Sequence, residues 1–348
     1  QLDFEMSFAT QEDVFRVGEE VLTATFEKFA PEGSVVTAAP YPVISYKQAM
    51  LEFGSDKPDL RNPLRIVDVT DFFQRCTFKP FHGQTVRAIK VSNKMSKGFH
   101  EKLLKFATSI GMGGLGYLEV KEDLSYKGPI DKFIPDDMKA EIREIAGLKA
   151  GDTIFFIADR EKQAALYAGQ LRNELGQRLD LLEKNAYRFC FINDFPMYEY
   201  DEEQKKIIFT HNPFSMPQGG LEALTTKDPL ELLAYQYDIV CNGVELSSGA
   251  VRNHNLDIMV KAFEIAGYTE EDLKEKFGAL YNAFQYGAPP HAGMAPGVDR
   301  MIMLLRNEEN IREVIPFPMN GNAQDVMCGA PNEVSEMQLR EVHIKVRK

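Results

Sequence analysis

The sequence lacks several features that mark large classes of protein. It has no apolar run near the roughly 18 residues that a membrane-spanning helix needs, and its first residues lack the basic and then apolar segments of a signal peptide. Its four cysteines, Cys76, Cys190, Cys241 and Cys328, form no Cys-x-x-Cys pair, so neither a zinc site nor a disulfide framework is predicted. We expect a cytoplasmic protein with reduced, mostly buried thiols and no membrane association.

The chain also lacks an excess of positive charge. Its 348 residues contain 40 lysines and arginines against 52 aspartates and glutamates, which gives a formal net charge of −12. This balance argues against a non-specific polyanion binder, although a local basic patch on an acidic body remains compatible with it. There is no internal repeat, no low-complexity tract, and no Ser/His/Asp or Cys/His pattern of a nucleophilic enzyme. At 348 residues the chain is long enough for two or three globular domains, and its 44% of hydrophobic residues is typical of a globular protein.

Turn-rich segments divide the sequence into several regions. Residues 1–8 alternate as a half-buried strand does, and helices are predicted over 14–29 and 46–53. Residues 54–63 are rich in turn formers, and we place a domain boundary there. The predicted domains are a first segment of the main domain over 1–63, an inserted module over 64–185, a second segment of the main domain over 186–330, and a C-terminal extension over 331–348.

Strand and helix patterns predict an α+β fold. Hairpins dominate the outer regions without regular β-α-β alternation, which favours a large antiparallel β-sheet flanked by helices and interrupted by a separate α+β module. Within the module we predict strands over 65–69, 85–91, 116–120 and 155–158, and helices over 100–110 and 161–182. After it we predict strands over 187–194, 207–210, 237–241 and 244–247, and helices over 255–266 and 270–286.

The glycines of Gly111-Met-Gly113-Gly-Leu-Gly116 satisfy the G-x-G-x-x-G pattern of dinucleotide-binding sites. That pattern requires a strand before it and a helix after it, so that the helix N-terminus faces the pyrophosphate. Here a helix is predicted before it and a strand after it. We therefore interpret these glycines as helix-terminating and turn residues.

A predicted hairpin brings two acids together. The Asn-Gly pair at 242–243 is the strongest short hairpin signal, and a two-residue turn there pairs Val240 with Glu245 and Asp238 with Ser247. Asp238 and Glu245 then lie on one face as diagonal neighbours about 7–8 Å apart. Such a pair can share Mg²⁺ with a nucleotide phosphate. The alternative is a polar sheet face exposed to solvent.

Three further residues fall in the same region of the chain. Gly249 is a candidate for a β-bulge, which would bring Arg252 to the face of the acids, whereas strict alternation from Glu245 would point Arg252 away. His211 precedes a proline-containing loop, where a lone histidine is usually structural. Its proximity in sequence to the acids makes it a candidate site residue.

The stretch Gly293-Met-Ala-Pro-Gly297-Val298-Asp299-Arg300 leads into an apolar helical pattern over 301–305. Its glycines permit close approach of the backbone to a ligand, and Arg300 follows in the first helical turn, where a guanidinium can meet a nucleotide. The alternative is an ordinary strand-to-helix turn with Asp299 as the N-cap.

Several segments resemble known motifs. Gln1-Leu-Asp3-Phe-Glu-Met-Ser-Phe8 resembles the second strand of motif 2 of class II aminoacyl-tRNA synthetases, and Gly297-Val298-Asp299-Arg300 resembles their motif 3. The order of the motifs over essentially the whole chain resembles aspartyl-tRNA synthetases of the bacterial type, and 64–185 resembles the GAD domain inserted in that family. The other segments that carry the resemblance are Gly54-Ser-Asp-Lys-Pro-Asp-Leu-Arg-Asn-Pro63, Asn193-Asp-Phe-Pro-Met197, His211-Asn-Pro-Phe214, Asn242-Gly-Val-Glu245, Ala288-Pro-Pro-His-Ala-Gly293 and Asn310-Ile-Arg-Glu-Val-Ile-Pro-Phe-Pro-Met319.

The resemblance implies a set of substrate contacts. Asp3, with Gln1, would lie at the α-amino group of bound L-aspartate, where a carboxylate pairs with an ammonium. Arg252 would bind the side-chain carboxylate of the substrate and so distinguish aspartate from asparagine. His211 would approach the same pocket.

The resemblance also implies a nucleotide and metal site. Asp238 and Glu245, with Ser248, would hold Mg²⁺ against the phosphates of ATP. The stretch 297–300, that is Gly297, Val298, Asp299 and Arg300, would bind ATP, with Arg300 at the adenine and the γ-phosphate. Arg300, Glu245 and Arg252 are the implied catalytic residues.

The implied activity is the ATP-dependent formation of aspartyl-adenylate and transfer of the aspartyl group to the 3′ end of tRNA(Asp), with tRNA(Asn) left open as a second acceptor. A homodimer is implied. The alternatives are another class IIb ligase, such as an asparaginyl or lysyl enzyme or an aspartate-adenylating paralogue, and a non-catalytic synthetase-like module. The inserted module could contact tRNA or serve as a structural spacer.

Two departures from the family pattern stand out. The anticodon-binding domain, motif 1 and the first half of motif 2 are not in these 348 residues, so we expect this chain alone to be inactive or nearly so. Ser247 and Ser248 stand where many bacterial relatives have glycines, which bears on the local strand geometry.

Overall fold

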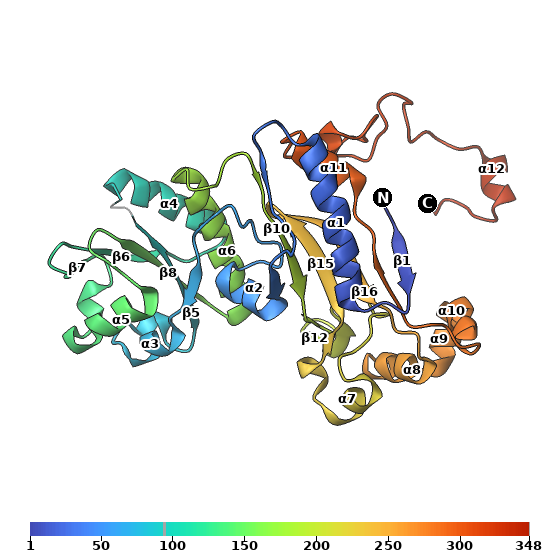
Figure 1. Ribbon diagram of the computed structural model, residues 1–348, viewed down its shortest axis with the longest axis horizontal. Helices are drawn as coiled ribbons and strands as arrows, with labels where there is room; N and C mark the ends of the chain where they lie inside the picture. The colour runs from blue at the N-terminus through green and yellow to red at the C-terminus, as the bar shows by residue number, and fades with distance from the viewer. Residues whose placement is uncertain (93–94, 348) are drawn as a thin grey trace. The chain divides into compact units, whose positions relative to one another are not determined.

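The computed structural model describes residues 1–92 and 95–347. The contacts between Cα atoms divide the chain into two compact units, one of Leu2–Pro296 and one of Gln1 with Gly297–Lys348. Figure 1 shows the elements of both. Each unit is described by itself.

The larger unit contains a six-stranded sheet whose strands come from distant regions of the sequence (Figure 1). Every neighbouring pair is antiparallel except β3 and β10, which are parallel. The order across the sheet is β1 (Phe4–Ser7), β17 (His291–Met294), β16 (Val244–Val251), β15 (Gln236–Cys241), β10 (Phe189–Asn193) and β3 (Val43–Ser45). The predicted antiparallel sheet is confirmed.

Helix α1 (Gln11–Phe29) covers one face of this sheet. Its start is fixed by a capping box in which Thr10 accepts from the N–H of Asp13 and Asp13 accepts from the N–H of Thr10. The ring of Phe15 stacks on Phe191 at 3.8 Å and meets Tyr237 edge-on at 5.0 Å. Because side chains alternate along a strand, the neighbours of these aromatic residues point to the face away from α1.

Between β3 and β10, and so inserted in the sequence of the first sheet, the chain forms a second, five-stranded antiparallel sheet (Figure 1). Its strand order is β4 (Ile66–Asp68), β5 (Thr85–Val91), β8 (Thr153–Asp159), β6 (Gly116–Val120) and β7 (Tyr126–Lys127). Both faces are covered, and alternation along β8 decides which side chain meets which layer: Ile154 and Phe156 pack with α3 (Thr70–Arg75) and α5 (Lys139–Ala146), and Phe155 and Ile157 with α4 (Lys97–Ser109) and α6 (Glu161–Arg178).

The remaining elements of the larger unit are short. Small two-stranded pairings are formed by β2 (Val35–Val36) with β9 (Ala186–Tyr187), by β11 (Phe195–Pro196) with β14 (Leu233–Ala234), and by β12 (Tyr198–Asp201) with β13 (Lys206–Phe209). The helices are α2 (Tyr46–Glu52), α7 (Gly220–Thr226), α8 (Leu256–Ile265), α9 (Glu270–Lys276) and α10 (Gly278–Phe284), with 3₁₀ turns at Lys79–Phe81, Asp131–Phe133, Asp136–Met138 and Pro229–Glu231.

Most predicted elements are observed, with shifts at their ends. The predicted helix over 270–286 is in fact the two helices α9 and α10, separated at Phe277. The predicted helix over 161–182 ends at Arg178. The glycines at 111–116 follow a helix and precede a strand, as predicted, and Gly111 has a φ of 103° that suits a residue just after a helix.

The smaller unit contains α11 (Val298–Leu305), the 3₁₀ turn Ile311–Glu313 and α12 (Glu336–Glu341). Gly297, not Asp299, is the N-cap of α11, because the helix begins at Val298, two residues earlier than an Asp299 cap would allow.

The cysteines are divided between the interior and the surface of the protein. All four cysteines are free thiols; Cys76, Cys190 and Cys241 are buried and Cys328 is exposed. Burial raises the pKa of the Cys190 thiol to about 12. No helix among the described residues combines the length and apolarity needed to cross a bilayer.

Candidate functional site

The two acids predicted on the hairpin lie on the face of the six-stranded sheet away from α1. The turn is as predicted, with Asn242 and Gly243 both at positive φ (53° and 84°) and Val240 opposite Glu245. The predicted partner of Asp238 is wrong: Asp238 lies opposite Ser248, not Ser247.

The reason is a bulge that falls earlier than expected. The register shifts between Ile239, which faces Ser247, and Val240, which faces Glu245, so Leu246 is the extra residue. Gly249 is not the bulge, because it pairs regularly with Tyr237. Past the bulge, even-numbered residues of β16 share the face of Asp238. The bulge at Leu246 therefore places Ser248 on the face of the acids, and regular alternation beyond it directs Arg252 to the same face.

Asp238 is a buried carboxyl in an unusual environment. It is 4% exposed, and its Oδ1 has no hydrogen-bond partner among the described residues. Burial and the neighbouring Glu245 carboxylate raise its pKa to about 7, although Ser248 and Lys57 act in the opposite direction. A buried acid with an unused oxygen facing a second acid has the character expected of a cation ligand.

A lysine lies beside these acids. Lys57 Nζ is 2.7 Å from Asp56 Oδ2 and 3.4 Å from Glu245 Oε2. Asp56 and Lys57 lie in the loop after α2. The turn-rich segment at the predicted domain boundary therefore contacts the hairpin through Lys57 and Glu245. Neither Asp56 nor Lys57 is among the site residues predicted from the sequence.

His211 lies near the same charges. Its ring meets Phe195 edge-on at 5.0 Å. Partial burial lowers the pKa of His211, with Asp56 and Glu245 opposing this effect and Lys57 adding to it. His211 therefore lies within electrostatic range of Asp56, Lys57 and Glu245.

Arg252 follows β16 and pairs with an acid from the first strand. Its Nε and Nη2 both donate to Glu5 Oε1, at 3.0 and 2.5 Å. Its backbone is held by an N–H bond to the His291 carbonyl oxygen (2.9 Å) and by a bridge with Ser215. Glu5 is a site residue that the sequence interpretation missed; its position two residues after Asp3 on a strand is the signal that could have indicated it.

Two glycines let the strands beside Arg252 approach closely. A Cβ on Gly293 would lie 2.2 Å from the Phe4 carbonyl oxygen and 2.5 Å from the Glu5 carboxyl carbon. A Cβ on Gly249 would lie 2.4 Å from the Gly293 carbonyl oxygen and 2.4 Å from the Tyr237 ring. Gly293 therefore serves strand packing and the placement of Glu5.

The other residues predicted at the site lie outside the strands of the six-stranded sheet. Asp3 is exposed and directly precedes β1. Gln1 belongs to the smaller unit, as do the predicted nucleotide residues at the start of α11, which are Gly297, Val298, Asp299 and Arg300. The larger unit thus brings together Asp238, Glu245, Ser248 and His211, and separately pairs Arg252 with Glu5.

The acid pair fits Mg²⁺ only with further oxygen ligands. Among the described residues, no group of three or more His, Cys, Asp or Glu side chains is placed to bind one metal ion. Mg²⁺ commonly takes one or two carboxylates and completes its shell with phosphate oxygens and water. The orphaned Oδ1 of buried Asp238, with Glu245 nearby, fits that donor set.

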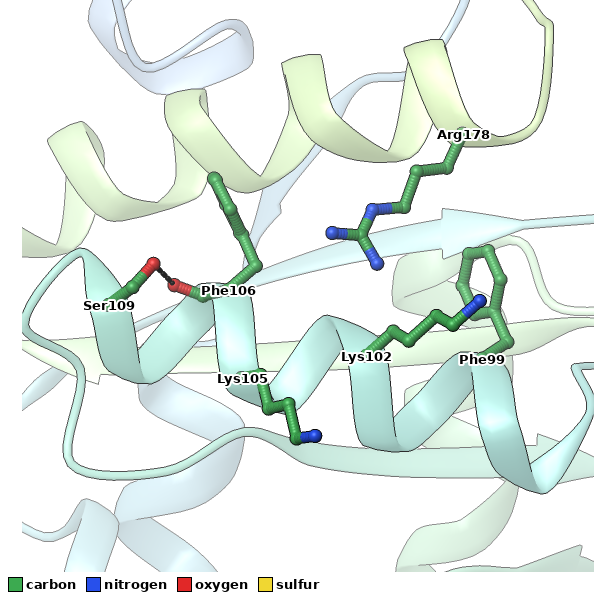
Figure 2. Close-up of a pocket in the computed structure, with 6 residues that line it drawn as sticks. All are labelled: Phe99, Lys102, Lys105, Phe106, Ser109 and Arg178. Carbon is green, nitrogen blue, oxygen red and sulfur yellow. Dashed lines mark hydrogen bonds between the residues drawn. The ribbon is translucent and has the colours of Figure 1, made fainter.

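A concave surface lies in the inserted region, between α4 and the end of α6 (Figure 2). This hollow of about 740 Å³ is lined by cations and aromatic rings, and no acid is among the described residues that line it. Its residues are Phe99, Lys102, Lys105, Phe106, Ser109 and Arg178. Asp238, Glu245 and Ser248, by contrast, lie on strands β15 and β16 of the six-stranded sheet.

Comparison with known proteins gives a consistent family. An aspartate–tRNA(Asp/Asn) ligase of Zymomonas mobilis subsp. mobilis is 55% identical over 353 residues, which is 99% of this chain and 59% of that protein. An aspartate–tRNA ligase of Streptomyces avermitilis is 52% identical over 350 residues, covering 100% of this chain and 59% of the relative. The crystal structure of asparaginyl-tRNA synthetase from Pyrococcus horikoshii aligns with 92% of this chain and 48% of its own, at 13% identity and a TM-score of 0.38.

The chain thus spans about three fifths of the length of these curated relatives. The family model described as tRNA synthetases class II (D, K and N) matches residues 1–321. With that match over most of its length, the chain belongs to the class II tRNA synthetases of the D, K and N group.

Proposed function

We propose that the protein is an aspartate–tRNA ligase that activates L-aspartate with ATP and transfers the aspartyl group to tRNA(Asp). Arg252 carries the choice of amino acid, because its guanidinium lies in the larger unit already oriented by a carboxylate, Glu5. A guanidinium binds a carboxylate through two parallel N–H bonds, and asparagine cannot accept both. Arg252 therefore favours aspartate over asparagine and lysine.

In the proposed first step, an α-carboxylate oxygen of aspartate attacks the α-phosphorus of ATP. A new C–O–P linkage forms as the bond to the β-phosphate breaks, and pyrophosphate leaves with the bonding electrons. The reaction needs positioning and charge neutralisation and no covalent enzyme intermediate. In the second step, a ribose hydroxyl at the tRNA 3′ end attacks the aspartyl carbonyl and AMP leaves.

The remaining roles follow the motif positions. Asp3, with Gln1, receives the ammonium of aspartate, and His211 borders the amino-acid pocket. Gly297, Val298, Asp299 and Arg300 bind ATP. Asp238, Glu245 and Ser248 would hold Mg²⁺, which when bound would supply positive charge to neutralise the phosphates of ATP.

The location, oligomeric state and domain arrangement of the protein are part of the same proposal. We propose a cytoplasmic homodimer that meets L-aspartate, ATP and tRNA there. The names of relatives such as the Zymomonas protein, which include tRNA(Asp/Asn), support tRNA(Asn) as an additional acceptor. We also propose that 64–185 is a GAD-like domain inserted between the core segments 1–63 and 186–330, with 331–348 as an extension.

The test is amino-acid-dependent exchange of pyrophosphate into ATP by the protein in its full natural length. Aspartate is expected to support exchange far better than asparagine or lysine. A preference for asparagine or lysine would replace the proposal with another ligase of the group. ATP binding without exchange for any of the three would favour a non-catalytic module. Aminoacylation of purified tRNA(Asp) and tRNA(Asn) then decides the acceptor.

A further inference from the structure

Lys57 lies among three carboxylates at the proposed metal site. Its Nζ is 2.7 Å from Asp56 Oδ2 and 3.4 Å from Glu245 Oε2, and Asp238 contributes to its electrostatic environment. With all groups ionised, three carboxylates and one ammonium leave a local charge of −3 + 1 = −2. A divalent cation matches that charge.

The loop that carries Lys57 is fastened by a buried arginine of α6. Arg172 is 1% exposed and donates to three backbone carbonyl oxygens: Nε to Leu64 (2.7 Å), and Nη2 to Asp59 (3.0 Å) and Asn62 (2.7 Å). Asn62 returns a hydrogen bond to the Arg172 carbonyl oxygen at 2.9 Å. Burying a guanidinium against neutral carbonyls is costly, which indicates that this position of the loop is specifically maintained.

Close packing fixes the beginning of the same loop. A Cβ on Gly54 would lie 2.2 Å from the Ala165 carbonyl oxygen, and one on Gly169 would lie 2.5 Å from the Gly54 carbonyl oxygen. The loop touches α6 with no room for side chains at these glycines. On its other side, a Cβ on Gly243 would be 3.5 Å from Asp59 Cβ, so the loop also packs against the turn of the acid-bearing hairpin.

The acid pair has a feature that points to a ligand. Asp238 is almost completely buried, and its Oδ1 has no hydrogen-bond partner among the residues that the structure describes. The Lys57 ammonium reaches Glu245 but leaves that oxygen unused. A cation that bound Asp238 and Glu245 together would therefore compete with Lys57 for Glu245.

We propose that Lys57 is an internal counter-cation of the Asp238–Glu245 pair, that Mg²⁺ displaces it, and that Arg172 is the positioning residue that sets where the Lys57 loop meets the hairpin. This inference rests on the proposed Mg²⁺ site and adds two residues to it. The inserted region thereby contributes to the metal site through α6. Lys57 limits repulsion between the acids before the metal arrives.

Binding of Mn²⁺ in the absence of ATP tests the competition, because Mn²⁺ replaces Mg²⁺ and can be counted by its electron spin resonance signal. Lys57→Met removes the ammonium and keeps the length of the side chain. We expect its Mn²⁺ Kd to fall by on the order of tenfold relative to wild type, since one competing charge a few ångströms away is removed. An unchanged or weaker affinity would overturn the proposal.

Two further variants separate competition from folding damage and from general charge. Lys57→Arg keeps a cation at the site and is expected to stay near the wild-type Kd. Lys184→Met removes a surface lysine paired with Asp180 (2.8 Å) and should leave the Kd within about twofold. Equal tightening in Lys184→Met and Lys57→Met would show a non-specific charge effect and refute the local competition.

Melting temperatures add a readout that does not depend on activity. Without divalent cations, Lys57→Met should melt below wild type, because the two acids lose the neighbouring positive charge of Lys57. Millimolar Mg²⁺ should raise the melting temperature of Lys57→Met more than that of wild type. A loss that Mg²⁺ does not selectively repair would mean that Lys57 is only structural.

The role of Arg172 is tested through Lys57. Arg172→Lys keeps the buried charge but removes the forked donor, so the loop should shift and the Mn²⁺ Kd should change in the wild-type background. In the Lys57→Met background the same substitution should have little further effect. Equal effects in both backgrounds would contradict positioning through Lys57. If Arg172→Lys does not fold, Asn62→Asp, which disturbs the same junction from the loop side, takes its place in the cycle.

The outcomes are distinguishable from those of the proposed function. A wild-type protein without aspartate-dependent exchange would contradict the ligase assignment, whereas the Mn²⁺ measurements would still decide whether Lys57 and a divalent cation compete. Conversely, active enzyme with no change in Mn²⁺ affinity in Lys57→Met would retain the function and reject the counter-cation.

Discussion

Arg252 and Glu5, 247 residues apart in the sequence, form an ion pair in which Nε and Nη2 share the single oxygen Oε1. The pair joins the first strand of the six-stranded sheet to the end of β16. Glu5 is held over Gly293, whose missing side chain makes the room. The Glu5 carboxylate thus orients the Arg252 guanidinium. We propose that this guanidinium binds the side-chain carboxylate of the substrate aspartate.

Arg252→Ala should raise the KM for aspartate by about 100-fold or more and change the KM for ATP little, because only the amino acid loses its charged partner. Pyrophosphate exchange at varied aspartate and ATP measures both. Glu5→Gln, which retains the shape but not the charge, should have a smaller effect on the KM for aspartate. Equal losses for aspartate and ATP in Arg252→Ala would mean that the arginine maintains the fold and does not select the substrate.

Glu245→Ala should raise the Mg²⁺ concentration needed for half-maximal exchange by about tenfold or more, since one of two protein carboxylates is removed from the metal. The matched control is Glu264→Ala, which removes an acid that pairs with Lys261 on the surface. A Mg²⁺ titration of the exchange rate compares the three proteins. The same Mg²⁺ requirement in Glu245→Ala and wild type would remove Glu245 from the metal site.

Gly249→Ala should destabilise the protein by about 3 kcal/mol or more, because its Cβ would overlap the Gly293 carbonyl oxygen and the Tyr237 ring. Gly113→Ala is the control: among the described residues, none apart from its chain neighbours has an atom within 4 Å of the point where its Cβ would be, and the free energy of unfolding should change by about 0.5 kcal/mol or less. Urea unfolding followed by circular dichroism measures both. Similar stability of the two variants would show that β16 and β17 are less tightly packed than described.

The Asp68–Arg87 pair in the inserted region should make stability depend on pH. Partial burial raises the pKa of Asp68, but hydrogen bonds from Thr70 and Arg87 and the arginine charge outweigh it, so the pKa is lowered. A carboxyl with a lowered pKa stabilises the fold above its unfolded value of about 3.8, and this contribution is lost as the pH falls through the folded pKa.

Asp68→Asn should therefore cost about 1 kcal/mol at pH 7, a modest figure because the Asp68 side chain is 46% exposed and screened by solvent. The difference from wild type should shrink as the pH approaches 3. Thermal unfolding at both pH values measures it, with the exposed Glu122→Gln as the control. A difference that stays constant with pH would assign the loss to packing and not to ionisation.

The hairpin illustrates what local sequence determines. Asn242 and Gly243 adopt the positive φ values that a two-residue turn needs, and the pairing of Val240 with Glu245 follows from the turn alone. The bulge at Leu246 could not be located in advance, because β16 is paired on both sides and its register also depends on β17. Ser247 shows this dependence: its hydroxyl accepts the N–H of Ala295, just past β17, at 3.0 Å.

Lys57 illustrates what local sequence leaves open. The segment 54–63 is predicted as a boundary because it is rich in turn residues, and that composition is silent on where its charged side chains point. Their placement depends on Arg172, more than 100 residues later, and on the hairpin turn at Gly243. Likewise Glu5 can be assigned to a strand from the sequence, but its partner Arg252 is known only once β1 pairs with β17.

The hydrogen bonds from Arg172 to the carbonyl oxygens of Asp59, Asn62 and Leu64 affect how this protein could be redesigned. An insertion that only spans two neighbouring ends can be exchanged for a short linker. Here the excised segment would take the donor with it and leave two acceptors on the retained loop, the carbonyl oxygens of Asp59 and Asn62, to be satisfied anew. A minimal version of the protein would therefore have to keep α6, or rebuild its end of the junction, even if the rest of the five-stranded sheet were dispensable.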